Sequence, residues 1–212
     1  PQATLGDTSV INGVTYTVVD DSTIAGEIAN GNVNLCTTLV TNMGINTADS
    51  EASNFFNNNS FNQNISFWDT SNVTNMMSMF FQTTEFNGDI GNWDTSNVIS
   101  MEGMFIESSF NNDVGNWNTS NVENMFIMFA LTSNFNQDIG NWDTSSVTNM
   151  ESMFFEATAF NQNLTGWCVS NITTEPETFA QDSALTEANK PLWGKEFTVA
   201  LTTGSNSQTV TA

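Results

Sequence analysis

The sequence lacks the side chains on which most enzymes and nucleic-acid-binding proteins depend. Its 212 residues include no histidine and no arginine, and the only basic residues are Lys190 and Lys195. There is no histidine to act as a general base, no cysteine beside a base and no glycine-rich phosphate loop. Binding to nucleic acid or to anionic lipid needs basic side chains that are missing here. We therefore expect neither an enzyme nor a nucleic-acid-binding protein.

Cysteines and long apolar runs are also scarce. Cys36 and Cys168 are too few for a disulfide scaffold and lack the spacing of a metal finger. No run approaches the ~20 apolar residues of a membrane-spanning helix, so we do not expect direct membrane insertion. The 23 acidic residues give a net charge of -21. Such a charge favours solubility and self-repulsion, and the alternative is a surface that depends on cations.

What the sequence does have is a repeat of about 25 residues, a period that indicates a solenoid. Tryptophan stands at position 8 of each copy, at Trp68, Trp93, Trp117, Trp142 and Trp167. Each copy opens with phenylalanine, as in FNGDIGNWDTSNVISMEGMFIESS from Phe86. In a solenoid no repeat can bury its apolar face alone, so each packs against its neighbours.

The apolar positions predict the secondary structure of each coil. Positions 13, 16, 19 and 20, which include Val73, Met76 and Phe80, have the spacing of one helix face. Positions 1, 5 and 8 are separated by small polar residues and fit a short extended segment. We therefore predict an α/β repeat fold, a right-handed leucine-rich-repeat-like solenoid with one short strand and one short helix per coil and a cap at each end.

The two ends of the repeat region differ from its middle. Residues 1–34 are expected to form an N-terminal cap, with a hairpin over 10–19 around Asn12-Gly13 and a helix over about 22–30 capped by Asp21 or Ser22. The solenoid then covers residues 35–184 in about six coils. In its last copy Glu175 and Thr178 take the places of core methionines, which marks the terminal coil.

The remaining residues are expected to close the structure and continue it. Residues 185–195 should form a C-terminal lid, and residues 196–212 a strand or linker into a following domain that is missing here. The first residue is Pro1 instead of methionine, so we expect an excised piece of a larger polypeptide.

Recurrent polar residues predict built-in hydrogen bonds. An asparagine follows the opening phenylalanine in every copy, at Asn62, Asn87, Asn111, Asn136 and Asn161. We expect these amides to bond the turn backbone of the next coil. The Asp-Thr-Ser-Asn tetrads after the tryptophans are expected to form local turns and caps.

The motif FNxDIxxWDTSNVTNMxxMF resembles the BspA-like repeats of bacterial cell-surface and secreted proteins, notably of Bacteroidetes and mycoplasmas. The resemblance covers about Leu35 to Gly194. It implies a leucine-rich-repeat solenoid that is secreted or exposed on the cell surface and that binds rather than catalyses. It also implies cysteines near each end to partner Cys36 and Cys168, but the lid here, PLWGKEF, has none.

Two positions of the extended segment are expected to face solvent. Position 4 holds Asn64, Asp89, Asp113, Asp138 and Asn163, and position 7 holds Phe67, Asn92, Asn116, Asn141 and Gly166. Stacked coils would bring successive members about 4.8 Å apart. The result is an acidic, asparagine-rich face suited to a glycan or a protein on another cell or surface. The candidate ligand-binding residues are Phe67, Asp89, Asn92, Asp113, Asn116, Asp138 and Asn141.

A second acidic column supplies the candidate metal ligands Asp69, Asp94 and Asp143, interrupted by Asn118. Stacked carboxylates repel one another unless hydrogen bonds or a cation compensate, and calcium takes oxygen ligands of this kind. The loop spacing matches no known calcium motif. No other cofactor is expected.

Two classes of function remain open. The chain is either a recognition or adhesion module of a secreted bacterial surface protein, or a purely structural spacer that carries neighbouring domains of the same polypeptide. A further alternative is a calcium-dependent or ice-binding module. The ice-binding alternative rests on a file of threonines that caps explain equally well, at Thr70, Thr95, Thr119 and Thr144.

Overall fold

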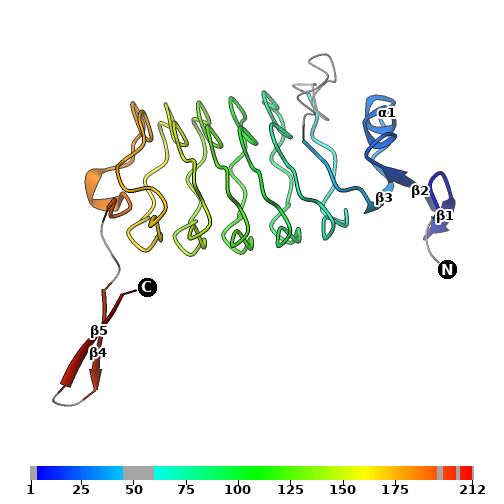
Figure 1. The fold of residues 1–212 in the computed structure, drawn as a ribbon. Helices are drawn as coiled ribbons and strands as arrows, with labels where there is room; N and C mark the ends of the chain where they lie inside the picture. Colours follow the sequence, from blue (N-terminus) through cyan, green and yellow to red (C-terminus); the bar gives the residue numbers. More distant parts are fainter. Residues whose placement is uncertain (1–3, 45–59, 195–197, 204–205, 212) are drawn as a thin grey trace.

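The repeats form a row of coils stacked side by side, with the N-terminal elements at one end (Figure 1). The structure is a computed structural model that describes residues 4–44, 60–194, 198–203 and 206–211. The buried apolar residues form one continuous cluster from Val19 to Leu185. The core therefore runs along the whole stack. No helix among the described residues is long and apolar enough to cross a membrane.

The N-terminal segment extends the stack by a small sheet. Strands β1 (Thr8–Ile11) and β2 (Val14–Asp20) pair in antiparallel fashion. Between them Asn12 and Gly13 have φ angles of 52° and 82°, as a type I′ turn requires. The predicted hairpin is therefore present. Strand β2 also pairs in parallel with β3 (Leu35–Leu39), which lies at the start of the predicted solenoid, in the first coil.

Helix α1 (Ile24–Ala29) lies between β2 and β3, and its cap differs from the prediction. Its N-cap residue is Thr23, not the predicted Asp21 or Ser22, and Thr23 makes no side-chain cap bond. Asp21 accepts hydrogen bonds from the backbone N–H groups of Thr41 and Asn42, at 2.7 and 3.0 Å. The side chains of Ile24 and Ile28 are buried and join the common core. Asp21 thus ties the helix start to the first coil.

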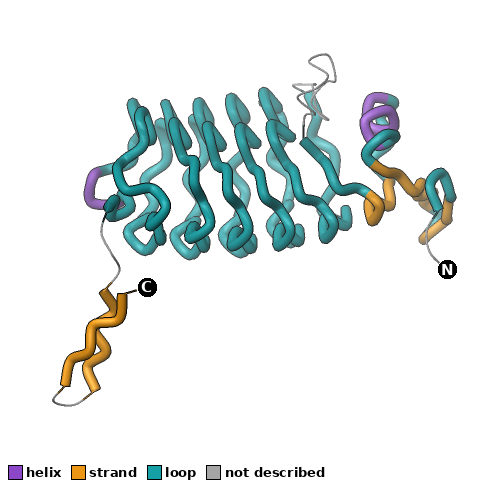
Figure 2. Tube along the Cα trace, in the orientation of Figure 1, coloured by secondary structure: helices purple, strands orange, loops and turns teal. Residues whose placement is uncertain are grey.

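The strand and the helix predicted for each coil are not formed. Between β3 and the short 3-10 helix η1 (Glu187–Asn189), the described residues contain turns and isolated bridges only (Figure 2). The bridges link Asn42, Asn75, Ser100, Asn124 and Asn149 in parallel. The secondary structure of the coils was therefore predicted wrongly. The right-handed course and the leucine-rich-repeat type stay predictions.

Overlapping turns replace the predicted helix. The N–H groups of Met79 and Phe81 bond the carbonyls three residues back, at Met76 and Ser78. The N–H groups that alternate with them, those of Ser78, Phe80 and Gln82, instead bond carbonyls of the next coil. An α-helix would use its interior N–H groups within the coil. Since half of them bond the neighbouring coil, the segment cannot be a helix even though its apolar spacing is helical.

This alternation requires left-handed backbone at two places in each coil, at positions 18 and 22 of the first four copies and one residue later in the last copy. The φ angles there lie between 49° and 59°, and only one of the residues is glycine. They are Ser78, Gly103, Ile127, Ser152 and Thr178 at the first position and Gln82, Glu107, Leu131, Glu156 and Asp182 at the second. A β-branched residue such as Ile127 is strained in this region. The hydrogen bonds between coils maintain the conformation.

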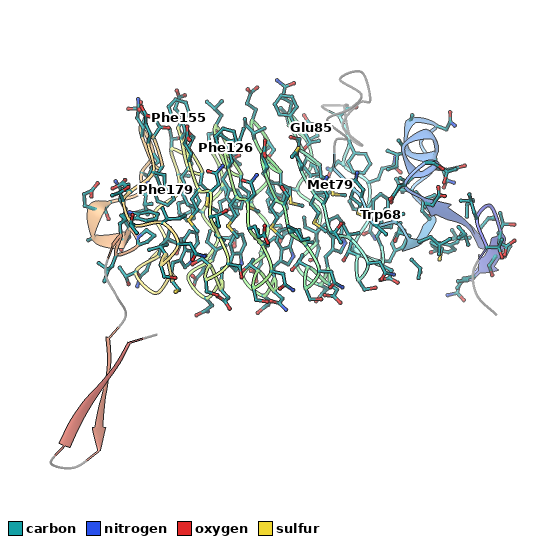
Figure 3. All side chains as sticks on the ribbon, viewed as in Figure 1. Trp68, Met79, Glu85, Phe126, Phe155 and Phe179 are labelled. Carbon is teal, nitrogen blue, oxygen red and sulfur yellow. The ribbon has the colours of Figure 1, made fainter. Side chains whose placement is uncertain are left out.

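Aromatic side chains fill the core from Trp68 near one end of the stack to Phe179 near the other (Figure 3). The rings of Trp68 and Trp93 lie 6.5 Å apart and 2° from parallel. The indole N–H of each repeat tryptophan also donates to a backbone carbonyl of the preceding coil, as Trp93 does to Ile65 at 3.2 Å and Trp117 to Ile90 at 3.0 Å. The tryptophan therefore both fills the core and joins two coils.

Polar side chains form further ladders between coils. The Thr70 hydroxyl donates to the Asp94 carbonyl at 3.0 Å, and the other threonines of this file repeat the bond. These threonines are 1% exposed, so they do not form the solvent-facing file that an ice-binding surface needs. The Asn87 side chain accepts the N–H of Asn111 at 2.8 Å, and Asn111 and Asn136 repeat this bond. The predicted role is confirmed for Asn87, Asn111, Asn136 and Asn161.

The last coil ends the series of backbone hydrogen bonds between coils. It has one extra residue between Ile172 and Pro176, so Phe179 and not Thr178 occupies the place of Met153: the Phe154 N–H donates to the Phe179 carbonyl, as the Phe129 N–H does to that of Met153. The predicted replacement of a core methionine by Thr178 is therefore wrong. Pro176 takes the place of Met150, because the Phe179 N–H bonds its carbonyl. Proline has no N–H to offer to a further coil.

The segment after the last coil packs on its end. Trp193 contacts Phe179 edge-on, with ring centroids 5.0 Å apart. Lys190 forms salt bridges with Glu175 and Glu187 at 2.7 and 2.6 Å. Strands β4 (Thr198–Thr203) and β5 (Asn206–Thr211) then form a separate antiparallel hairpin. Both cysteines are free thiols.

Replacing Trp117 by alanine should destabilise the stack much more than the same change at Trp193. Trp117 is 4% exposed, stacks on Trp142 and bonds the Ile90 carbonyl, so its loss leaves a cavity and an unpaired acceptor. We expect a loss of ~3–5 kcal/mol in the free energy of unfolding. Urea denaturation followed by circular dichroism measures it. Equal losses at the half-buried Trp193 would contradict this account.

The threonine ladder can be tested with two nearly isosteric changes. Thr119→Val keeps the shape of the side chain but leaves the Asp143 carbonyl without its buried donor. We expect this variant to lose ~1–3 kcal/mol of stability. Thr119→Ser retains the hydroxyl and is the control for the donor. If Thr119→Val unfolds at the same denaturant concentration as the wild type, the ladder bond contributes nothing. The last coil already has Val169 at this position.

Candidate functional site

The candidate site is the surface formed by positions 4 and 7 of the coils, here called the polar ribbon. Its members are Asn64, Asp89, Asp113, Asp138 and Asn163 at position 4 and Phe67, Asn92, Asn116, Asn141 and Gly166 at position 7. All ten residues are exposed. The structure therefore brings every predicted ligand-binding residue to the surface. What each of them does there differs between the two positions.

Position 4 is partly occupied by the fold. The Asp113 carboxylate accepts the N–H of Gly115 at 2.8 Å, and Asp89 and Asp138 accept the corresponding N–H groups of Gly91 and Gly140. Asn64 and Asn163 make the same bond with amide oxygens. The turn therefore needs an acceptor but not a charge. In the aspartates the second carboxylate oxygen is left for another partner.

Position 7 is not used by the fold. Within the described part of the chain, the side chains of Asn92, Asn116 and Asn141 form no hydrogen bond, unlike those of the position 2 asparagines. Phe67 and Gly166 occupy the same position in other coils, so the backbone there does not require asparagine. These amides are exposed donors and acceptors with no structural task.

A hollow lies on the ribbon between the coils of Trp93 and Trp117. It has a volume of about 320 Å³ and is lined by Asp89, Gly91, Asn92, Asn112, Asp113 and Asn116. Four of the predicted residues thus share one hollow. A side chain at Gly91 would put its Cβ 2.6 Å from the Asp113 carbonyl, so the backbones of the two coils are in close contact there.

Sequence reasoning missed Gly91 and Asn112. Position 3 holds Gln63, Gly88, Asn112, Gln137 and Gln162, so its variation carries no signal of a shared role. Asn112 is held in place by its own bonds: its amide donates to the Asn87 carbonyl at 3.3 Å, and its side-chain oxygen accepts the Asp113 N–H at 2.9 Å. The hollow therefore offers carboxylate and amide groups from two adjacent coils.

The N-terminal end of the ribbon is aromatic. Phe67 is 42% exposed and meets Tyr16 of β2 edge-on, with ring centroids 5.7 Å apart and planes at 89°. Tyr16 is the only tyrosine of the chain and lies in the hairpin, far from Phe67 in sequence. Nothing in the repeat pattern indicates this contact, which only the pairing of β2 with the first coil creates.

The second acidic column serves the turns. Asp69, Asp94 and Asp143 accept the N–H groups of Ser71, Ser96 and Ser145 at 3.0–3.1 Å. The serine hydroxyl and then its N–H hold the pKa of the Asp94 and Asp143 carboxyls below the usual value, and the Ser71 hydroxyl is the main cause at Asp69. In the part of the chain that the structure describes, no cluster of three or more acidic, cysteine or histidine side chains could hold a metal ion. The predicted metal candidates do not converge.

The lowered pKa values make the turns sensitive to acid. A carboxyl with a lowered pKa in the folded state stabilises the fold above its unfolded pKa of ~3.9, and this contribution disappears as the pH falls through the folded pKa. We expect Asp69→Asn, Asp94→Asn and Asp143→Asn combined to flatten the fall in melting temperature below about pH 4. Asn118 already accepts the Ser120 N–H in the same turn.

A matched variant controls for the loss of three charges. Glu85→Gln, Glu123→Gln and Glu151→Gln remove as much charge from exposed positions outside these turns. Melting curves from pH 6 to about pH 2 would be recorded by circular dichroism for both triple variants. An equal flattening in both would show that net charge, and not the turn carboxylates, governs the acid response.

The repeat region matches one known family. The family described as "Mycoplasma protein of unknown function, DUF285" matches residues 32–115 and 100–193. No curated protein and no solved structure matches the sequence. The BspA-like assignment remains a prediction. Because the two matches together span residues 32–193, which is more than half of the chain, the protein belongs to the DUF285 family of bacterial repeat proteins.

Proposed function

We propose that the chain is a non-catalytic recognition module of a secreted or cell-surface bacterial protein and that it binds a glycan or protein ligand on the polar ribbon. The observation that carries this proposal is the row of asparagines at position 7. Asn92, Asn116 and Asn141 are exposed, recur in consecutive coils and form no hydrogen bond within the described chain. By contrast, the position 2 asparagines, which the fold uses, accept a backbone N–H of the next coil.

The hollow supports the proposal because it concentrates these groups. Two amides of position 7 and two carboxylates of position 4 lie around one depression. Each amide can donate and accept, and each carboxylate has an oxygen free of the turn bond, so a ligand rich in hydroxyl or amide groups would find complementary partners. The backbones beneath are in close contact, which holds the groups in a preformed arrangement.

A structural spacer is the second candidate, and the ladders favour it. Tryptophan, threonine and asparagine side chains bond every pair of adjacent complete coils. Such a stack resists bending, which suits a module that holds other domains at a distance. The two functions are compatible, but only recognition depends on the ribbon side chains.

The test is an array of glycans and extracellular proteins, probed with the wild-type chain and with the triple variant Asn92→Ala, Asn116→Ala, Asn141→Ala. These changes remove no bond of the fold, so the melting temperature should stay within about 2 °C of the wild-type value. We expect the wild type to bind at least one ligand and the variant to lose most of that signal. A spacer predicts no ligand, or no difference between the two proteins.

A control variant distinguishes the ribbon from other exposed polar surface. Ser133→Ala, Asn134→Ala and Thr158→Ala change three exposed side chains that also form no side-chain hydrogen bond in the described chain. They lie in the turns that precede the opening phenylalanines, outside the ribbon. This variant should bind like the wild type. Equal losses in both triple variants would place the binding surface elsewhere.

A further inference from the structure

The aromatic pair at the N-terminal end of the ribbon indicates the class of ligand. Phe67 is the one aromatic residue among the largely exposed apolar side chains of the described chain. It stands in the position that Asn92 and Asn116 occupy in the next two coils. The ribbon therefore begins with a ring face and continues with amides and carboxylates.

The contact with Tyr16 gives this end a defined shape. The two rings meet at 89°, so the edge of one ring faces the other and Phe67 is held by the β1–β2 hairpin. Tyr16 is only partly buried, and its hydroxyl forms no hydrogen bond in the described part of the chain. An apolar surface with polar groups beside it suits a ligand that has both characters.

Sugars have this dual character. A pyranose ring has C–H faces that pack on aromatic rings and a rim of hydroxyls that bond amides and carboxylates. The ribbon repeats its polar groups once per coil, and equivalent rings of adjacent coils, such as Phe80 and Phe105 or Trp68 and Trp93, lie 5.4 and 6.5 Å apart. This spacing is close to the length of one sugar unit in an extended chain. A linear glycan would therefore meet the same pair of groups, a carboxylate and an amide, at each of the three middle coils.

The negative charge of the ribbon narrows the class of glycan further. The ribbon contains three aspartates, and the chain has a net charge of -21 with only two basic residues. A sulfated or uronic-acid polymer would be repelled along its whole length. A neutral glycan avoids this repulsion and can use the carboxylates as acceptors for its hydroxyls.

We infer that the polar ribbon binds an unbranched neutral glycan lengthwise, with Phe67 and Tyr16 as the stacking platform for the sugar at its N-terminal end. This inference rests on the proposed function and narrows it. It assigns the N-terminal hairpin, which supplies Tyr16, to the binding surface. It also assigns the ligand a repeating structure that matches the repeat of the protein.

The test is calorimetric titration of the full chain with linear neutral oligosaccharides of glucose, N-acetylglucosamine, xylose and mannose, each as disaccharide and hexasaccharide. For at least one sugar we expect the hexasaccharide to bind about tenfold or more tightly than the disaccharide, because further subsites are filled. Hexagalacturonic acid, which is anionic, should not bind. If no neutral hexasaccharide binds, or if length has no effect, the inference fails.

Variants at Phe67 test the platform. Phe67→Ala should weaken hexasaccharide binding about tenfold, whereas Phe67→Trp should retain it because a ring face remains. Leu192→Ala removes an apolar side chain of similar exposure outside the ribbon and should change nothing. Binding by Phe67→Ala at wild-type affinity, in a protein with an unchanged melting curve, would overturn the role of the aromatic pair.

The outcome for the inference can be separated from that for the proposed function. If the array identifies a protein ligand whose binding is lost in the asparagine variant, while no neutral hexasaccharide binds, the recognition function stands and the glycan inference fails. If neither a glycan nor a protein binds the wild-type chain, both fail together.

Discussion

The structure depends on backbone hydrogen bonds that each coil shares with its neighbour. Alternate N–H groups from Met76 to Gln82 bond carbonyls of the following coil, and this pattern recurs along the stack. It excludes a helix and forces left-handed backbone at two positions per coil. It also means that the last coil must have fewer N–H groups that need a carbonyl from a further coil. Pro176, which lacks an N–H, stands at the corresponding place in the last coil.

The same constraint explains which polar residues are structural. Thr119, Asn111 and Trp117 each bond a backbone group of an adjacent coil, and a side chain with such a bond is not available to a ligand. The aspartates of the second acidic column are likewise engaged in turns. Subtracting these groups leaves the position 7 asparagines and one carboxylate oxygen per position 4 aspartate. The proposed ligand surface consists of these remaining groups.

The high negative charge of the chain is compatible with the way in which the coils are held together. The coils are held together by aromatic stacking and by hydrogen bonds, and where a carboxylate takes part, as Glu102 and Glu107 do, its donor is a neutral amide. The salt bridges of the described residues lie in the C-terminal segment. Cohesion of the stack therefore does not depend on opposite charges. The exposed carboxylates are free to repel anionic surfaces and neighbouring copies of the chain.

The sequence alone predicted the repeat, the buried tryptophans, the Asn12-Gly13 hairpin and the asparagine ladder, because these follow from period, apolarity and turn chemistry. It could not predict the turn segment, since Val73, Met76 and Phe80 have helical spacing whether their N–H groups bond within the coil or across it. Nor could it show that the threonines are buried, that Tyr16 meets Phe67 or that Gly91 and Asn112 complete the hollow. These features depend on contacts between residues distant in the chain, so only the stacking of the coils decided them.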